Sequence, residues 1–382
     1  MNNGANELIK QPQGYGPKKP EIIDMAQQAS DNIHIGKSVH AVKKHDGCSY
    51  IDGVPMLEWG KHRDNTYCGA IAAASEVMGI NVSYETLMGV SGLCFRFGMK
   101  PDWCPSSPLA QNGRVWDENI NALLGVSIYS IADDEERKTK IVEQLDRGFP
   151  IIGMGQMGAP EWDLLTGYHQ DSGAFFGRSY FDSQESNPDS VYCLDKNDYY
   201  TDNKYRRAQN YPGMEPSVFV KFFDRACEKK SALELLKSSL EICLYYHDCA
   251  PIYGTYFGVT AYDIMIKGLL ADSDENEHYH LGCLADSRLC ASKYLNESAA
   301  LLNNENSRKK LQRIATLYRD IYDSIISITP YETLTPVFNR AGNHAPWDRD
   351  IRVTLVGALR QIIKMEDEIC KSVKEILQNC DE

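Results

Sequence analysis

The chain has 382 residues, of which 53 are acidic and 40 are basic, so its formal net charge is −13. Proteins that track the phosphates of nucleic acids usually carry a basic stripe, whereas the lysine pairs here are dispersed among acids, so we expect no nucleic-acid partner. Hydrophobic residues make up 43% of the chain, which is enough for a sizeable core without disulfides, and the length predicts two domains.

The first ten residues are polar and lack the apolar segment of a secretory signal. Elsewhere, charged residues interrupt the apolar runs before they reach the roughly 20 residues that a membrane helix needs. We therefore expect a cytoplasmic protein without a membrane partner.

Twelve cysteines are scattered along the chain, and none forms a Cys-x-x-Cys pair. Structural zinc sites need two close ligand pairs, and the fourth ligand that His278, His280 and Cys283 would require is not apparent. The glycine pattern at 153–158 follows a strand, but Pro160 stands where a dinucleotide-binding helix would begin. We expect no metal and no other cofactor, and most thiols should be buried as small hydrophobic groups.

The expected elements begin after an arm at 1–45 that carries no motif. From 46 to 225, helix and strand patterns mix without a βαβ repeat, which predicts an α+β domain. Helices are expected at 66–78 (ended by Gly79), from Ser83 to 88, at 117–124 and at 139–147. Strands are expected at 126–131, 150–154, 162–168, 174–181 and 218–223, with a hairpin turn at 169–173.

The remaining residues, 226–382, are expected to form an all-α helical bundle. The segments that show apolar residues at helical spacing and polar opposite faces are 231–246, 261–270, 278–302, 307–328 and 348–377. Their lengths suit antiparallel packing, and this region could support a homodimer.

Cys68 is the residue that most directly suggests chemistry, because it stands at the start of the expected helix at 66–78. Unpaired N–H groups and the helix dipole favour a thiolate there, and a thiolate is the nucleophilic form of cysteine. The alternative is an inert cysteine buried in a core helix. The local sequence leaves both open.

Later strands extend this pattern. The segment 161–168 reads Glu-Trp-Asp-Leu-Leu-Thr-Gly-Tyr and is followed by Tyr-Phe-Asp at 180–182. The pattern resembles the double-glycine leader peptidases and, more closely, the acyltransferase family of the N-terminal domain of butirosin biosynthesis protein H. That resemblance implies a papain-like fold, in which the cysteine-bearing helix packs on an antiparallel sheet, with Cys68 as nucleophile and Asp182 as the residue that orients a histidine.

Two positions depart from the peptidase pattern: Glu161 falls where those enzymes have the histidine, and Ser183 follows the aspartate in place of proline. The chain also resembles, over most of its length from about residue 45, a bacterial family in which glutamate at 161 is the normal residue. The shared motifs are Gly-Phe-Pro-Ile at 148–151, Pro-Glu-Trp at 160–162, Thr-Gly-Tyr at 166–168 and Gly-Arg-Ser-Tyr-Phe-Asp at 177–182.

A carboxylate is a poor substitute for that histidine, because like-charge repulsion raises the pKa of a neighbouring thiol. Two histidines could replace it as the base. His62 lies where the peptidases place an oxyanion-hole glutamine, and His169 follows the strand at its far end. Each is also a candidate for an ordinary surface residue.

Aromatic residues are expected around Cys68, and such walls with a few polar groups suit a small-molecule or acyl-chain pocket. The alternative is plain core packing. The residues expected to contact a ligand are Asn65, Phe95, Arg96, Trp103 and Trp162.

Two functional hypotheses follow from these residues. The first is a cysteine-dependent hydrolase or acyltransferase acting on an amide or thioester of a small molecule, a peptide or a carrier protein, with Cys68 attacking and His62 or Asn65 holding the oxyanion. The second is a catalytically inactive papain-like module that binds a small molecule or peptide, in which Glu161 recognises a cationic or hydrogen-bond-donating group.

Overall fold

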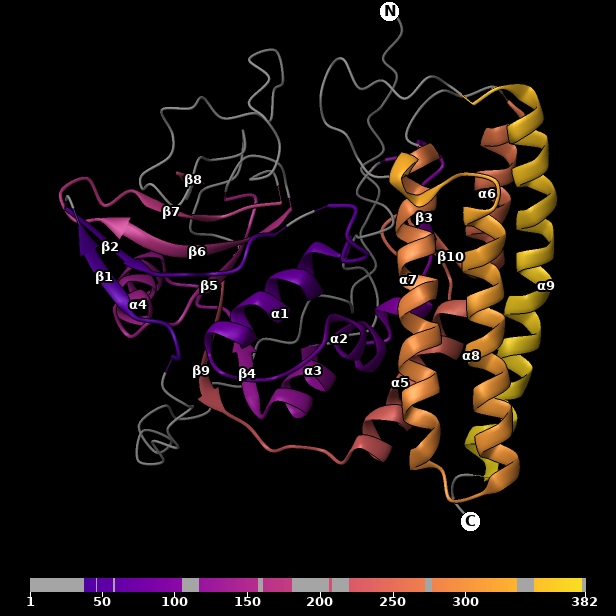
Figure 1. The fold of residues 1–382 in the computed structure, drawn as a ribbon, viewed down its shortest axis with the longest axis horizontal. Coiled ribbons are helices and arrows are strands. Elements are labelled where there is room, and N and C mark those ends of the chain that lie inside the picture. Colours follow the sequence, from indigo (N-terminus) through magenta and orange to yellow (C-terminus); the bar gives the residue numbers. More distant parts are fainter. Residues whose placement is uncertain are drawn as a thin grey trace, which may run out of the picture. The chain divides into compact units, whose positions relative to one another are not determined.

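The protein is described from a computed structural model that combines an antiparallel sheet and its helices with a C-terminal helical region. The structure describes residues 38–45, 47–57, 59–104, 117–156, 161–180, 206–207, 220–271, 277–334 and 347–379. Of the expected arm at 1–45, positions 1–37 lie outside the described residues. The expected α+β class is therefore correct, and helices follow the sheet in the sequence as predicted (Figure 1).

The sheet is curled and antiparallel, with its described strands in the order β1-β2-β6-β5-β9-β4, and with β7 pairing to β6 and β8. The strands are β1 (Val42–His45), β2 (Cys48–Ile51), β4 (Val126–Tyr129), β5 (Ile151–Met154), β6 (Trp162–His169), β7 (Phe175–Arg178), β8 (Arg206–Arg207) and β9 (Val220–Ala226). Strands β1 and β2 were not predicted from the sequence. The predicted hairpin is confirmed, since β6 and β7 pair across the turn at 169–173.

Strand β6 is the centre of the sheet, because it pairs with β2, β5 and β7. Its residues from Trp162 to Gly167 are all buried. A strand covered on both faces carries a continuous run of buried residues where a half-exposed strand alternates. Gly167 is required at this crowded position, since a Cβ there would lie 2.6 Å from both the Phe176 ring and the Ser49 carbonyl oxygen.

The helices of this part of the chain are α1 (Thr66–Val77), α2 (Tyr84–Val90), α3 (Asp117–Leu124) and α4 (Asp134–Asp146). Helix α1 packs on β5 and β6 and is almost entirely buried, which its alanines and glycine permit. The expected start and end of α1 are confirmed, as is the cap of α2 by Ser83. Helix α4 begins five residues before the expected position, where Asp133 caps it.

The helical region contains α5 (Ala232–Asp248), α6 (Gly258–Leu270), α7 (Glu277–Ser298), α8 (Glu305–Ile326) and α9 (Arg349–Asn379). Helices α7, α8 and α9 lie side by side, and α5 and α6 pack on α9 (Figure 1). A short ribbon pairs β10 (Tyr256–Phe257) with β3 (Gly98–Met99) and links this region to the segment after α2. None of the described helices combines the length and the apolar character needed to cross a membrane.

Helix α7 differs from its expected amphipathic form, because every residue from Leu281 to Ala291 is buried. Helix α2 packs against it from the N-terminal part and α8 from the other side. A helix covered all round has no solvent face, so its charged residues need partners. Arg288 donates from Nε to Glu366 of α9 at 2.7 Å and from Nη1 to the carbonyl of Cys94 at 2.8 Å.

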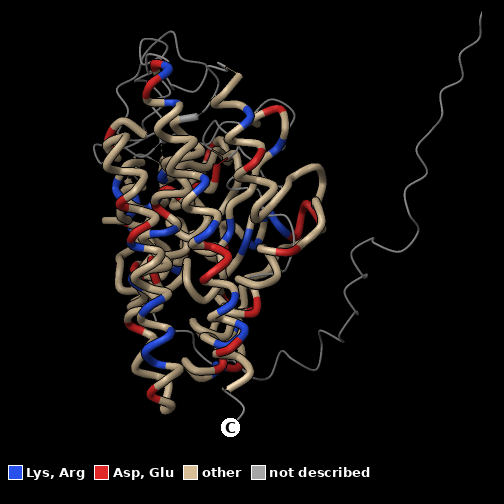
Figure 2. The backbone as a smooth tube through the Cα atoms, turned by 90° about the vertical axis from the view of Figure 1, so that its right-hand side faces the viewer, with Lys and Arg blue, Asp and Glu red and all other residues tan. Residues whose placement is uncertain are grey.

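Charges of both signs alternate along the outer faces of the helices (Figure 2). Ion pairs join α8 to α9, as between Lys310 and Glu375 and between Arg313 and Glu368. Exposed pairs of this kind contribute little to stability. The buried core, which is continuous from the sheet to α9, therefore holds the described parts together.

Candidate functional site

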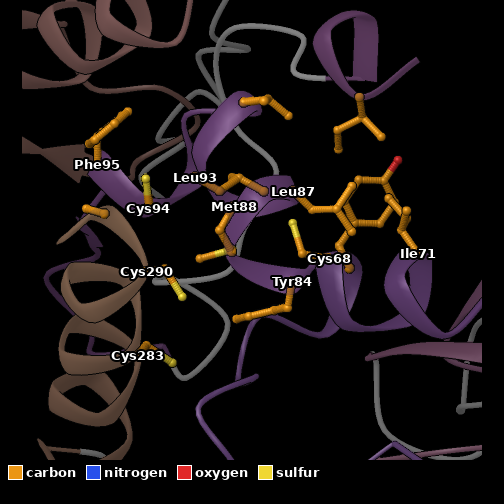
Figure 3. Packing of buried hydrophobic residues seen from close by; sticks show 14 of the residues in the cluster. Cys68, Ile71, Tyr84, Leu87, Met88, Leu93, Cys94, Phe95, Cys283 and Cys290 are labelled. Carbon is orange, nitrogen blue, oxygen red and sulfur yellow. The ribbon is translucent and has the colours of Figure 1, made fainter. Parts of the chain in front are cut away.

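Cys68 occupies the first turn of α1, as expected, and its N–H is capped by the Asn65 side chain at 3.0 Å. The thiol, however, is sealed: the residue is 0% exposed, and Figure 3 shows it directed toward α2, where Leu87 and Met88 lie. Burial raises the pKa of the Cys68 thiol far above its usual range, and the Ser91 hydrogen bond offsets only part of this effect. The expectation of a thiolate open to a cleft is therefore corrected, because desolvation outweighs the helix dipole.

The described cysteines follow the general expectation for reduced thiols. Ten are free, and seven of them are buried. Figure 3 places Cys94, Cys283 and Cys290 in the same core as Cys68. Cys68 is thus one buried thiol among several.

The two candidate bases lie elsewhere. The ring of His62 stacks on Tyr331 with centroids 3.9 Å apart, and burial lowers its pKa. His169 ends β6, where its Nδ1 accepts from the N–H of Ser172. Eight residues of extended strand separate it from Glu161, or roughly 26 Å. The structure brings neither ring into a described hydrogen bond with Cys68.

Glu161 stands immediately before β6 and faces the start of α1. The hydroxyl of Thr66 donates to Glu161 Oε2 at 2.8 Å, while the N–H of Trp162 approaches the same hydroxyl at 3.4 Å. Burial raises the pKa of Glu161 to about 7, against the opposing effect of the Thr66 hydrogen bond. This half-buried carboxyl therefore changes charge near neutral pH.

Two buried tyrosines, Tyr180 and Tyr279, lie within electrostatic range of Glu161 and pack against Trp59. The ring centroid of Trp59 lies 4.8 Å from that of Tyr180 and 6.1 Å from that of Tyr279. Burial raises the pKa of both tyrosines, and the nearby Glu161 charge adds to the effect. Tyr180 and Tyr279 were not predicted as site residues, and no spacing in the sequence connects them to Glu161.

A second polar cluster holds the start of α1 against the sheet. Lys221 of β9 donates to Asp117 at 2.5 Å and to the Tyr67 hydroxyl at 3.0 Å, and Tyr67 donates to the same carboxylate. The ammonium lies 4.7 Å from the centroid of the Tyr67 ring and 5.5 Å from that of Trp162. A lysine within the apolar strand Val-Lys-Phe-Phe was the available sequence signal for this cluster.

Two buried aspartates join the approach to α1 to the helical region. Asp64 accepts from the Gly60 N–H at 2.8 Å and from the Tyr331 hydroxyl at 2.5 Å. Asp286 accepts from the Tyr84 hydroxyl at 2.7 Å and from the Asp64 N–H at 3.2 Å. Burial raises the pKa of both carboxyls. Sequence reasoning missed this pair because 222 residues separate its members.

The other predicted ligand contacts are mostly core residues. Arg96 is buried, and burial lowers the pKa of its guanidinium. Phe95 packs against Tyr318, with centroids 5.7 Å apart, and Trp103 packs edge-on to His280 at 5.5 Å. The expectation that these three line an open pocket is corrected in favour of core packing, because the helical region covers them. The adjoining cavity, about 10 Å³, has room for no more than a water molecule.

The remaining predicted site residue, Asp182, lies outside the described residues. Among those described, no group of three or more histidine, cysteine or acidic side chains could hold a metal ion. No protein-family model matches the chain, and no curated protein matches it. We therefore infer function from the geometry around α1 and β6.

Proposed function

We propose that the protein is a catalytically inactive papain-like module that binds a small molecule or peptide, and that Glu161 recognises a cationic group of the ligand. The observation that carries this proposal is the state of Glu161. It is a half-buried carboxyl with a pKa of about 7, held through one oxygen by Thr66. No described residue donates a hydrogen bond to the other oxygen, and in this proposal that oxygen accepts one from the ligand.

The papain-like assignment is supported by the arrangement of α1. A helix with Cys68 in its first turn packs on an antiparallel sheet, and Glu161 precedes the central strand of that sheet. In the resemblance described above, that position belongs to the catalytic histidine. Under this proposal, Glu161 stands at the position that the resemblance gives to the base.

Catalysis by Cys68 is disfavoured by two features. The thiol is buried with a raised pKa, so its nucleophilic form is rare at neutral pH. The two candidate histidines contact other groups: His62 stacks on Tyr331, and His169 accepts a hydrogen bond from Ser172. A nucleophilic cysteine needs a base within hydrogen-bond reach.

A cation is favoured over other ligand groups by the neighbours of Glu161. Carboxylates attract ammonium and guanidinium groups, and aromatic faces add a further attraction. Tyr180 and Tyr279 lie within electrostatic range of the acid, and Trp59 packs against both; in this proposal these rings supply the aromatic contribution. The combination disfavours an anionic ligand, because a carboxylate or phosphate would meet Glu161 with like charge.

The test compares wild-type protein with Glu161→Gln, which keeps the shape of the side chain and removes its charge. Thermal unfolding is measured with agmatine, butylamine and tetramethylammonium, and with butanol and butyrate as neutral and anionic controls. We expect the cations to raise the Tm of the wild type only, and more at pH 8 than at pH 6, because Glu161 ionises between these values. Equal shifts in both proteins would refute recognition by Glu161.

A further inference from the structure

A cleft of about 350 Å³ opens along α1, between the loop after β2 and the start of α2. Helix α1 contributes residues at positions 69, 72, 73 and 76, which share one face of an α-helix. The other lining residues come from the loop after β2, from the segment between α1 and α2, from Tyr84 at the start of α2, and from Arg63 and Tyr180. Neither Cys68 nor Glu161 lines it. Its volume falls in the range of small-ligand pockets.

The wall of the cleft formed by α1 is smooth because its side chains are small. Ala72 and Ala73 line it together with Gly69. A Cβ on Gly69 would lie 1.7 Å from the Tyr180 hydroxyl, and that hydroxyl donates to the Arg63 carbonyl at 3.1 Å. The backbone of Arg63 is therefore fixed beside Gly69, at the N-terminal end of the cleft.

Opposite charges stand at the two ends. Arg63 and Glu76 line the cleft and are exposed, and neither forms an ion pair with another residue that the structure describes. Glu76 lies seven residues beyond Gly69, which corresponds to about 10 Å along the helix axis. The dipole of α1 adds positive potential at the Arg63 end of the cleft, because the N-terminal end of a helix is positive.

We infer that this cleft binds a short extended peptide of about three residues with free termini, its carboxylate at Arg63 and its ammonium group at Glu76. An extended chain rises about 3.3 Å per residue, so a tripeptide matches the rise of about 10 Å along α1 from Gly69, beside the Arg63 backbone, to Glu76. Asn81, which also lines the cleft, offers a donor and an acceptor to the peptide groups. This site goes beyond the proposed function, because it does not use Glu161.

Isothermal titration calorimetry on the full chain tests the inference with trialanine, N-acetyl-trialanine and trialanine amide. The variants are Arg63→Gln, Glu76→Gln and Ala72→Leu, which places a larger side chain in the cleft. Arg349→Gln and Glu297→Gln are the matched controls, because both are exposed charges away from the cleft. Far-UV circular dichroism and thermal unfolding establish that each variant is folded.

Trialanine is expected to bind the wild type and both controls with one-to-one stoichiometry, and Ala72→Leu to weaken binding about ten-fold or more. N-acetylation should weaken binding to the wild type about two- to five-fold, as for an exposed ion pair, and should have no further effect in Glu76→Gln. C-terminal amidation should likewise weaken binding to the wild type about two- to five-fold and should have no further effect in Arg63→Gln.

Absence of saturable binding in the wild type would overturn the inference, as would an acetylation penalty of equal size in wild type and Glu76→Gln. The charge variants change exposed residues, so a folding defect in Ala72→Leu would leave this comparison intact. Trialanine binding that persists in Glu161→Gln separates this site from the one proposed above. Loss of binding in that variant alone would assign the peptide to Glu161 and refute peptide binding in the cleft.

Discussion

The Thr66 hydroxyl donates a hydrogen bond to the Glu161 carboxylate across 2.8 Å and so ties the first residue of α1 to the residue before β6. This bond favours the charged form of Glu161, whereas burial favours the neutral form and prevails. The result is a carboxyl that gains or loses its proton near pH 7. The same geometry leads to the first of four predictions.

Thr66→Val keeps the shape of the buried side chain and removes the hydroxyl. We expect the pKa of Glu161 to rise above about 7, because a hydrogen bond to the charged form is lost. The measurement is a carboxyl ¹³C chemical-shift titration, with the Glu161 resonance assigned by its absence in Glu161→Gln. Thr354→Val, an exposed change on α9, should leave the titration unaltered. An unchanged pKa in Thr66→Val would contradict the assigned role of the hydroxyl.

Cys68 should be among the least reactive described thiols of the native protein. Its pKa is raised by burial, while Cys104 and Cys227 are only half-buried. Under native conditions at pH 8, iodoacetamide should label Cys104 and Cys227 before Cys68, and label Cys68 at a rate set by opening of the core. A time course followed by peptide mass spectrometry gives the three rates. Preferential alkylation of Cys68 at pH 6 would restore the nucleophile hypothesis.

Asp286→Asn should make the free energy of unfolding less dependent on pH. Burial raises the pKa of Asp286 in the folded state, so the folded protein retains its proton where the unfolded chain has lost it. The resulting stability is complete below the ordinary aspartate value near 4 and declines as pH rises toward the folded value. Urea unfolding at pH 5, 7 and 9 should show the wild type losing stability relative to Asp286→Asn.

The control for this experiment is Asp320→Asn, which changes an exposed residue of α8 and should follow the wild type at each pH. Glu161 also contributes to the wild-type slope in the same direction. That contribution is present in both proteins and cancels in the difference. Parallel curves for wild type and Asp286→Asn would disprove the buried, protonated state.

Arg288→Met should destabilise the protein by about 3–5 kcal/mol, because it leaves the buried Glu366 without its cation. Glu366 would keep only the Tyr262 hydroxyl, which donates to it at 2.8 Å. Urea unfolding measures the change. The double variant Arg288→Met with Glu366→Met should recover part of the loss, since no unpaired charge then remains. Arg313→Met, on the exposed face of α8, should cost little by comparison.

Local features of the fold were predictable where the determinant is short in sequence. The cap of α2 by Ser83, the end of α1 near Gly79 and the hairpin between β6 and β7 all depend on residues a few positions apart. Strand β2 pairs with a neighbour more than 100 residues away, where Cys48 lies opposite His169. Strand β1 pairs locally with β2, where His45 lies opposite Cys48, and the Asp-Gly pair at 46–47 is a short-range hairpin signal that was overlooked.

The sequence by itself determined the α+β class, the helical C-terminal region and the position of Cys68 in the first turn of a helix, since these follow from hydrophobic spacing and capping. Only the tertiary structure decided that this thiol is sealed, that Glu161 meets Thr66, and that Asp64 meets Asp286. The physical reason is that desolvation sets these ionisation states, and it depends on which distant segments cover a side chain.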